Sequence, residues 1–166
     1  MATAVKNPTT NLLQITVPRR IEASPDEVFD AWAEPELFER WFEPKHAILR
    51  KAAVDELWYW VAEHAGRLWA HYCRYVRVER PRLIEFTWMS EATRGLETRV
   101  IIEMTPSRGG TDLVLTHSGV PDDELGRSHE EGWSRSPASS PRRSRASGAT
   151  DARGSSETRG MIARLG

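Results

Sequence analysis

Residues 22–44 read EASPDEVFDAWAEPELFERWFEP, a pattern that predicts two short amphipathic helices separated by a proline. Ser24, followed by Pro25 and then Glu27, has the form of a capping box. The hydroxyl accepts from an unpaired backbone N–H, the proline suits the first helical position, and the carboxylate lies in the first turn. A helix therefore begins here. Its apolar face is formed by residues at helical spacing: Val28, Phe29 and Trp32.

Pro35 ends this helix and begins a second one, because proline is excluded from a helix interior but favoured at its start. The second helix repeats the apolar spacing of the first with Leu37, Phe38, Trp41 and Phe42. Helices this short are unstable in isolation. They must pack against a larger structure.

The rest of the chain up to about residue 118 supplies that structure as a series of predicted strands. They cover residues 12–21, 47–54, 57–63, 68–78, 83–89, 98–104 and 113–118, of which 47–54 is the weakest pattern. Pro18 predicts an edge position or a bulge in the first strand. Ala65-Gly66 and Gly109-Gly110 predict the turns of two hairpins. The order strand, two helices, then hairpins indicates an α+β fold with an antiparallel sheet.

Several stretches together resemble the SRPBCC (START-like) superfamily and, within it, AHSA1-like domains, which are similar to the C-terminal domain of the activator of Hsp90 ATPase. They are SPDEVFDAWAEPELFERWF (24–42), VERPRLIEFTW (78–88), ETRVIIEMTP (97–106), GGTDLVLTHSGVPDD (109–123) and HEEGW (129–133), and they span most of residues 11–133. The resemblance implies a helix-grip (START/Bet v 1-like) fold. In that fold an antiparallel sheet wraps around a long C-terminal helix and encloses an apolar cavity, and two short helices close one end.

The chain departs from the family pattern at two places within the sheet. Asp55-Glu56 stands where members commonly carry a Gly-Gly turn, and the glycine that is common near Cys73 is absent.

The larger departure is at the C-terminus. After HEEGW the family continues into its long helix, whereas residues 134–166 hold eight Ser, seven Arg and no aromatic residue. Such a segment buries too little apolar surface to offset its ordering entropy, so we predict that it is disordered. The sequence thus predicts an SRPBCC domain over 1–133, with its C-terminal helix missing or degraded, and a disordered basic tail over 134–166.

Three explanations of this tail remain open. We favour a reading-frame shift, because Arg, Ser, Pro, Ala and Gly are typical of GC-rich coding DNA read out of frame. The alternatives are a genuine basic tail that contacts nucleic acid or anionic surfaces, and a plain linker or solubility tail. The tail holds seven Arg and two acidic residues, whereas the other 133 residues hold 16 basic and 22 acidic residues. A domain this acidic is a poor nucleic-acid binder.

Aromatic residues supply the candidates for a ligand cavity. The chain has seven Trp, six of them between Trp32 and Trp88. Each could simply fill the core, and several could also line a cavity for an apolar or aromatic small molecule. For His117 we favour a structural role. The candidates for the cavity are Trp32, Trp41, Trp58, Trp60, Trp69, His71, Tyr75, Trp88 and His117.

The sequence predicts no metal site, no cofactor and no catalytic residue. The five His show no ligand spacing, and Cys73 is a lone cysteine in an apolar strand. Gly109-Gly110 lies between strands rather than before a helix, so it is not a phosphate-binding loop. No signal peptide or membrane span is present, and we predict a cytoplasmic protein without membrane contact.

Three function classes follow. A small-molecule binding protein ranks first. A cyclase- or aromatase-like enzyme that uses a cavity His, Arg or Glu as acid or base ranks second. A chaperone partner, which rests on the resemblance to the Hsp90 activator alone, ranks third.

Overall fold

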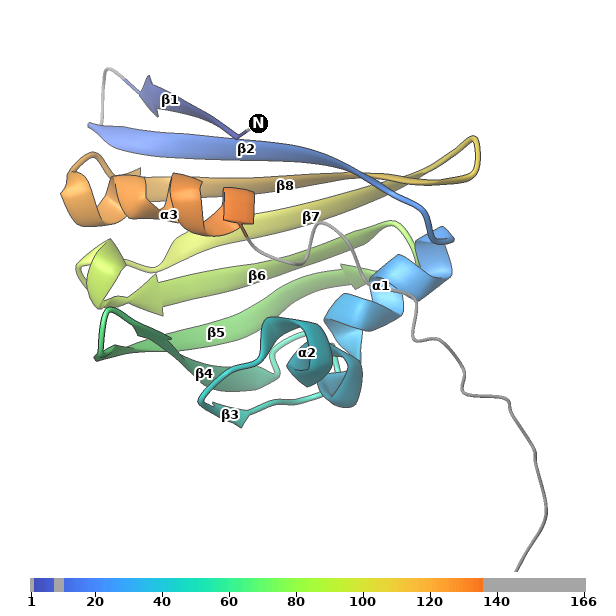
Figure 1. Ribbon diagram of the computed structural model, residues 1–166, viewed down its shortest axis with the longest axis horizontal. Coiled ribbons are helices and arrows are strands. Elements are labelled where there is room, and N and C mark those ends of the chain that lie inside the picture. The colour runs from blue at the N-terminus through green and yellow to red at the C-terminus, as the bar shows by residue number, and fades with distance from the viewer. Residues whose placement is uncertain (1, 8–10, 136–166) are drawn as a thin grey trace, which may run out of the picture.

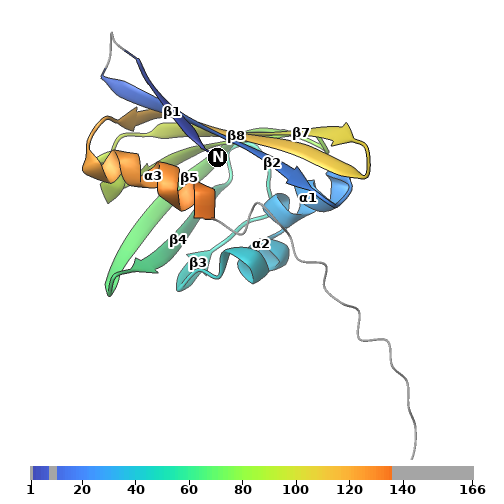
Figure 2. The same ribbon diagram turned by 45° about the horizontal axis from the view of Figure 1, so that its top comes forward.

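The computed structural model describes residues 2–7 and 11–135. In this part of the chain, one antiparallel sheet has the spatial order β1-β2-β8-β7-β6-β5-β4-β3, and the helices lie on its concave face (Figures 1 and 2). The strands are β1 (Thr3–Asn7), β2 (Leu12–Ile21), β3 (His46–Ile48), β4 (Leu57–His64), β5 (Arg67–Glu79), β6 (Leu83–Ser90), β7 (Thr98–Ser107) and β8 (Gly110–Pro121). The helices are α1 (Pro25–Ala33), α2 (Pro35–Phe42), the short η1 (Glu91–Thr93) and α3 (Glu124–Arg135). The predicted α+β, helix-grip fold with two short N-terminal helices is confirmed.

Helix α1 begins as its sequence predicts. The Ser24 hydroxyl accepts a hydrogen bond from the Glu27 backbone N–H at 3.3 Å, and the Ser24 N–H donates to the Glu27 carboxylate at 2.8 Å. These two bonds are the reciprocal pair of a capping box. Pro35 then begins α2 one residue after the C-cap of α1. Both helices and the residue that divides them are therefore confirmed.

The structure corrects the strand predicted over 47–54. In this region the strand is only three residues long, β3, which pairs with β4. The loop that follows includes Asp55 with φ +69°, a backbone conformation that glycine adopts more easily, so an Asp occupies a position that suits the family's Gly-Gly turn. The Ala65-Gly66 hairpin is confirmed, since His64 pairs with Arg67.

The second predicted turn lies one residue earlier than expected. Ser107 pairs with Gly110, so the turn residues between β7 and β8 are Arg108 and Gly109, and Gly109 has φ +78°. A Cβ on Gly110 would come within 2.1 Å of the Ile21 carbonyl oxygen. The second glycine is thus needed for close approach of β2 and not for the turn itself.

Pro18 lies in β2 where that strand has one free side. On one side, Pro18 pairs with Val114 of β8. On the other side, β1 pairs with β2 only as far as Thr16, so no described residue pairs with Pro18 there. A proline without an N–H costs no ladder hydrogen bond at such an edge. The predicted edge position is confirmed, whereas the irregularity in the strand falls between Leu13 and Gln14. The sequence did not predict β1.

Helix α3 is the described part of the C-terminal region, and the prediction that the long C-terminal helix is missing or degraded beyond it stays a prediction, because residues 136–166 lie outside the described part of the chain. Helix α3 is 12 residues long and packs against β2, β8 and η1. Gly126 permits this contact, because a Cβ there would lie 1.9 Å from the Pro121 carbonyl oxygen. Ser134 and Arg135, which we assigned to the tail, belong to this helix, and the predicted disorder of the remaining tail lies outside the described residues.

Aromatic side chains fill the space between α1, α2 and the sheet. Trp58 on β4 lies 5.4 Å from Phe38, 5.5 Å from Tyr75 and 5.2 Å from Phe86 between ring centroids. Trp41 continues the contacts to Trp32 and donates its indole N–H to the Ala31 carbonyl at 2.6 Å. We call this set the packed aromatic cluster: Trp32, Phe38, Trp41, Trp58, Tyr75 and Phe86.

Candidate functional site

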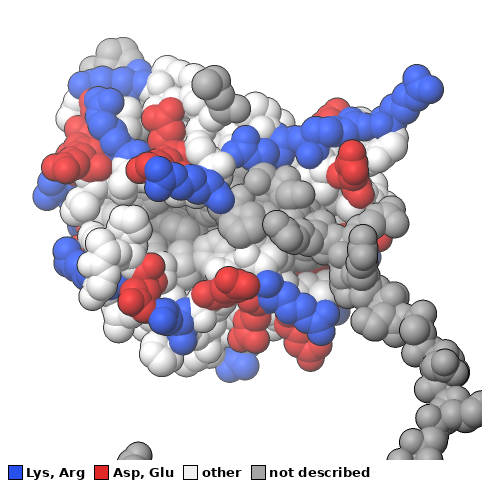
Figure 3. All heavy atoms as spheres, in the orientation of Figure 1, with Lys and Arg blue, Asp and Glu red and all other residues white. Residues whose placement is uncertain are grey.

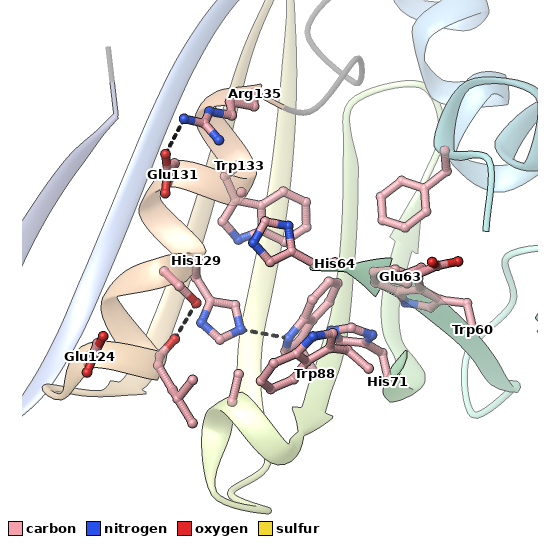
Figure 4. Close-up of a pocket in the computed structure, with 17 residues that line it drawn as sticks. Trp60, Glu63, His64, His71, Trp88, Glu124, His129, Glu131, Trp133 and Arg135 are labelled. Carbon is pink, nitrogen blue, oxygen red and sulfur yellow. Dashed lines mark hydrogen bonds and ion pairs between the residues drawn. The ribbon is translucent and has the colours of Figure 1, made fainter. Parts of the chain in front are cut away.

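At the other end of the concave face, α3 and strands β4 to β6 leave a cavity of about 580 Å³. Figure 4 shows α3 on one side of it and the strands on the other. Phe42, the last residue of α2, separates the cavity from the packed aromatic cluster through ring contacts to both Trp41 and Trp60. The principal aromatic lining residues are Trp60, Trp69, His71, Trp88, His129 and Trp133.

The wall on the sheet side is a set of stacked and tilted rings. His71 on β5 stacks on Trp60 of the paired strand β4, with centroids 3.9 Å apart and planes 5° apart. Trp88 on β6 lies 5.3 Å from Trp60 and 5.0 Å from Trp133 of α3. The strand pairing therefore places three aromatic rings side by side, and Trp133 meets them from the helix.

His129 joins α3 to this wall. Trp88 donates its indole N–H to His129 Nε2 at 3.2 Å, and His129 Nδ1 lies 3.0 Å from the Gly126 carbonyl oxygen. Because an indole N–H can only donate, Nε2 must be the acceptor and Nδ1 must carry the proton. Figure 4 shows His129 pointing from α3 toward Trp88. Both of its nitrogens are thus engaged within the protein.

His117 on β8 lies behind the wall and is fully buried. Trp133 donates its indole N–H to His117 Nδ1 at 3.1 Å, so Nε2 carries the proton and donates to the Thr98 hydroxyl at 2.7 Å. The Thr98 hydroxyl in turn donates to the Trp88 carbonyl at 2.6 Å. This chain of bonds fixes α3 on the sheet, which is the structural role that the sequence favoured for His117.

His71 differs from the other two histidines because it makes no hydrogen bond to a described residue. Its Nδ1 is enclosed by protein without a partner, and its side chain is 7% exposed. Buried polar groups are usually paired, so an unpaired one at a cavity wall needs an explanation.

All three histidines are neutral at pH 7. Burial, with a contribution from His129, lowers the pKa of His71 to about 3, although nearby backbone carbonyls oppose the shift. Burial beside the other two imidazoles lowers the pKa of His117 well below its ordinary value. Burial also lowers the pKa of His129, against the opposing effect of two backbone carbonyls and of Asp123. The cavity wall therefore carries no positive charge from these imidazoles.

The charged residues that line the cavity are mainly acidic. Glu63, Glu124 and Glu131 face a single cation, Arg135, which forms an ion pair with Glu131. Glu63 is paired with Lys45 at 2.7 Å. Figure 3 shows acidic and basic side chains interspersed over this face of the molecule. No broad basic surface is visible on it.

The predicted cavity residues separate into two groups. Trp60, Trp69, His71 and Trp88 line the cavity. The others lie elsewhere: Trp32, Trp41, Trp58 and Tyr75 belong to the packed aromatic cluster, and His117 is buried behind Trp133. The sequence analysis did not identify His129, Trp133 or Phe42 as lining residues. For His129 and Trp133 the available signal was their helical spacing with Leu125, four residues apart, whereas Phe42 had been assigned only to the apolar face of the second helix.

The described part of the chain gives little support for a metal site, a cysteine nucleophile or a membrane-spanning helix. Residues 2–7 and 11–135 contain no group of three His, Cys, Asp or Glu side chains that could hold a metal ion. Cys73 is buried, and burial raises the pKa of its thiol well above the usual value, so it is a poor nucleophile. Within the same residues, no helix has the length and apolar character needed to cross a membrane.

The sequence matches the model of the family described as Activator of Hsp90 ATPase homolog 1-like protein over residues 22–139. The chain belongs to this AHSA1-like family. The match begins at Glu22, just before the capping box, and extends through α3. A search of curated proteins found no match.

Three solved structures illustrate the likeness in fold. CV1439 from Chromobacterium violaceum aligns with a TM-score of 0.63 and 22% identity, over 76% of this chain and 93% of that chain. CalU16 from Micromonospora echinospora aligns with a TM-score of 0.55 and 24% identity, over 81% of this chain and 77% of that chain. DynU16, from the dynemicin biosynthetic locus, aligns with a TM-score of 0.61 and 22% identity, over 74% of this chain and 44% of that chain. At these identities the likeness shows the fold alone.

Proposed function

We propose that this AHSA1-like protein binds an apolar or aromatic small molecule in the cavity between α3 and β4 to β6. The observation that carries the proposal is a cavity of about 580 Å³ walled by aromatic rings, in a domain whose other end is filled by the same residue types. Ligand pockets typically measure roughly 300–1,000 Å³ and combine apolar walls with a few polar groups. We also keep the prediction of a cytoplasmic location.

An enzyme that uses the same cavity is the weaker alternative. A general base must be free to take a proton and have a pKa near the working pH. His117 and His129 have both nitrogens engaged, and the pKa of His71 is about 3. A binding role requires none of these groups to react. A chaperone partner is suggested only by the family's name.

Gly132 on α3 offers a way to test binding. It lines the cavity, and a Cβ placed on it meets no atom within 4 Å. We expect Gly132→Phe to occupy the cavity mouth without disturbing α3, and Gly132→Ala to serve as the control that also replaces the glycine with a better helix former but adds only a methyl group. Tryptophan fluorescence of the full chain, titrated with naphthalene, should saturate for the wild type.

The expected result is an affinity about tenfold or more weaker for Gly132→Phe, and an affinity within about twofold of wild type for Gly132→Ala. Equal affinities for Gly132→Phe and the wild type would place the ligand elsewhere. A folded wild-type protein whose fluorescence does not respond would contradict the binding function itself.

A further inference from the structure

His71 is one of three side chains of the cavity wall that have a buried nitrogen without a hydrogen-bond partner; the other two nitrogens are the indole Nε1 atoms of Trp60 and Trp69, which can only donate. His117 and His129 each accept from an indole N–H and donate to an oxygen, whereas His71 makes no hydrogen bond to a described residue. Its ring is held in place by stacking on Trp60 at 3.9 Å. A ligand cannot reach the enclosed Nδ1, but Nε2 also makes no hydrogen bond to a described residue and is the nitrogen that a ligand in the cavity can engage.

The geometry also limits which atom a ligand reaches. His71 Nδ1 is enclosed by protein, so a molecule in the cavity meets the ring at its Nε2 edge. In a neutral imidazole, Nε2 is an acceptor in one tautomer and a donor in the other. A hydroxyl group can both donate and accept, and it therefore suits either tautomer. A carbonyl or ether oxygen suits only one of them.

Charge argues against an anionic ligand. The three neutral histidines provide no positive charge in the wall, and the lining cation Arg135 is already paired with Glu131, as Glu63 is with Lys45, so Glu124 leaves the lining slightly acidic. A carboxylate that entered the cavity would lose hydration without meeting a buried cation, and it would pass acidic side chains on the way. A neutral ligand avoids both penalties.

We propose that the ligand is a neutral aromatic alcohol or phenol, whose ring packs against Trp60, Trp88 and Trp133 and whose hydroxyl forms a hydrogen bond with His71. The assignment rests on the proposed binding function and adds the chemical class of the ligand. His71 thereby acts as the specificity-determining residue of the cavity.

The test compares three ligands that share one ring system: 2-naphthol, naphthalene and 2-naphthoate. Each is titrated into the full-length wild type and into His71→Phe, which keeps an aromatic ring against Trp60 but removes both nitrogens. We expect the wild type to bind 2-naphthol about tenfold more tightly than naphthalene, as one net hydrogen bond provides, and to bind 2-naphthoate most weakly. His71→Phe should lose the preference for 2-naphthol and keep its affinity for naphthalene.

Two results would overturn the assignment: a preference for 2-naphthol that survives in His71→Phe, or a wild type that binds 2-naphthoate as tightly as 2-naphthol. Failure of all three ligands to bind would instead contradict the proposed function. If His71→Phe does not fold, the imidazole ¹⁵N shifts of His71 in the wild type decide the matter. They should move with 2-naphthol and stay unchanged with naphthalene, and a response that is the same for both ligands would refute the contact.

Discussion

Aromatic residues line both ends of the concave face, but they pack closely at one end and leave a cavity at the other. Beneath α1 and α2, aromatic rings from helices and strands pack into contact, and Trp58 is 5% exposed. Beneath α3, Trp60 and Trp88 are equally buried, yet a cavity of about 580 Å³ remains. The difference lies in the helices that pack over the sheet. α1 and α2 direct bulky rings at the sheet, whereas α3 lines the cavity partly with Ser128 and Gly132. Aromatic content alone therefore does not identify a binding site.

The largest expected effect is a difference between the two ends in the cost of removing a tryptophan. Trp58→Ala should lower the free energy of unfolding by about 3–5 kcal/mol, because it leaves a void among closely packed rings. Trp69→Ala, at the half-buried cavity wall, should cost about 1 kcal/mol, since less surface returns to water. Chemical denaturation measures both changes. Equal costs would show that the two ends do not differ in packing.

A second prediction uses the three buried histidines, His71, His117 and His129, which lie at the cavity end. Their pKa values in the folded protein lie below the unfolded value of 6.5, so the unfolded chain binds protons that the folded one does not. The stability that these groups contribute is therefore fully present above about pH 6.5 and is lost as the pH falls below that value. For His71 the loss continues until the pH reaches its folded-state pKa of about 3. Each such group contributes up to about 1.4 kcal/mol per pH unit.

Denaturant unfolding at pH 7, 6 and 5 measures this slope. His71→Phe should reduce the slope by about one proton, whereas Trp58→Phe, in the packed aromatic cluster, should leave it unchanged. Wild-type and His71→Phe proteins with the same slope would mean that His71 is not buried in its neutral form.

The smallest expected effect concerns the start of α1, one of the two helices over the packed aromatic cluster. Ser24→Ala removes the acceptor for the Glu27 N–H and should lower the free energy of unfolding by about 0.5–2 kcal/mol. Because the cap lies far from α3, the affinity for naphthalene should stay within about twofold of wild type. A large loss of affinity would show that the two ends are coupled.

The parts of the fold that the sequence predicted are those encoded by local signals. Ser24, Pro25 and Glu27 define the start of α1 through contacts within four residues, and Ala65-Gly66 defines a hairpin in the same way. The strand predicted over 47–54 was wrong because composition does not show where a strand partner ends. β1 was missed because its five residues, TAVKN, form a strand only by pairing with β2.

The cavity could be predicted only in part for a related reason. Trp58 and Trp60 alternate on β4, so the sequence places both on the same face of the sheet. Only the tertiary position of α2 and α3 decides that one packs and the other lines a cavity. His129 and Trp133 were missed because α3 has few apolar residues, and the residues that it directs at the cavity, Leu125, His129 and Trp133, recur only every four residues.

The most direct test of the account observes the seven tryptophan indole N–H groups separately in a ¹H–¹⁵N spectrum during titration with 2-naphthol. We predict that the signals of Trp60, Trp69, Trp88 and Trp133 shift saturably with a single dissociation constant. Those of Trp32, Trp41 and Trp58 should stay in place. Shifts confined to Trp32, Trp41 and Trp58, or no shifts from a folded protein, would contradict the claim that the cavity under α3 is the ligand-binding site.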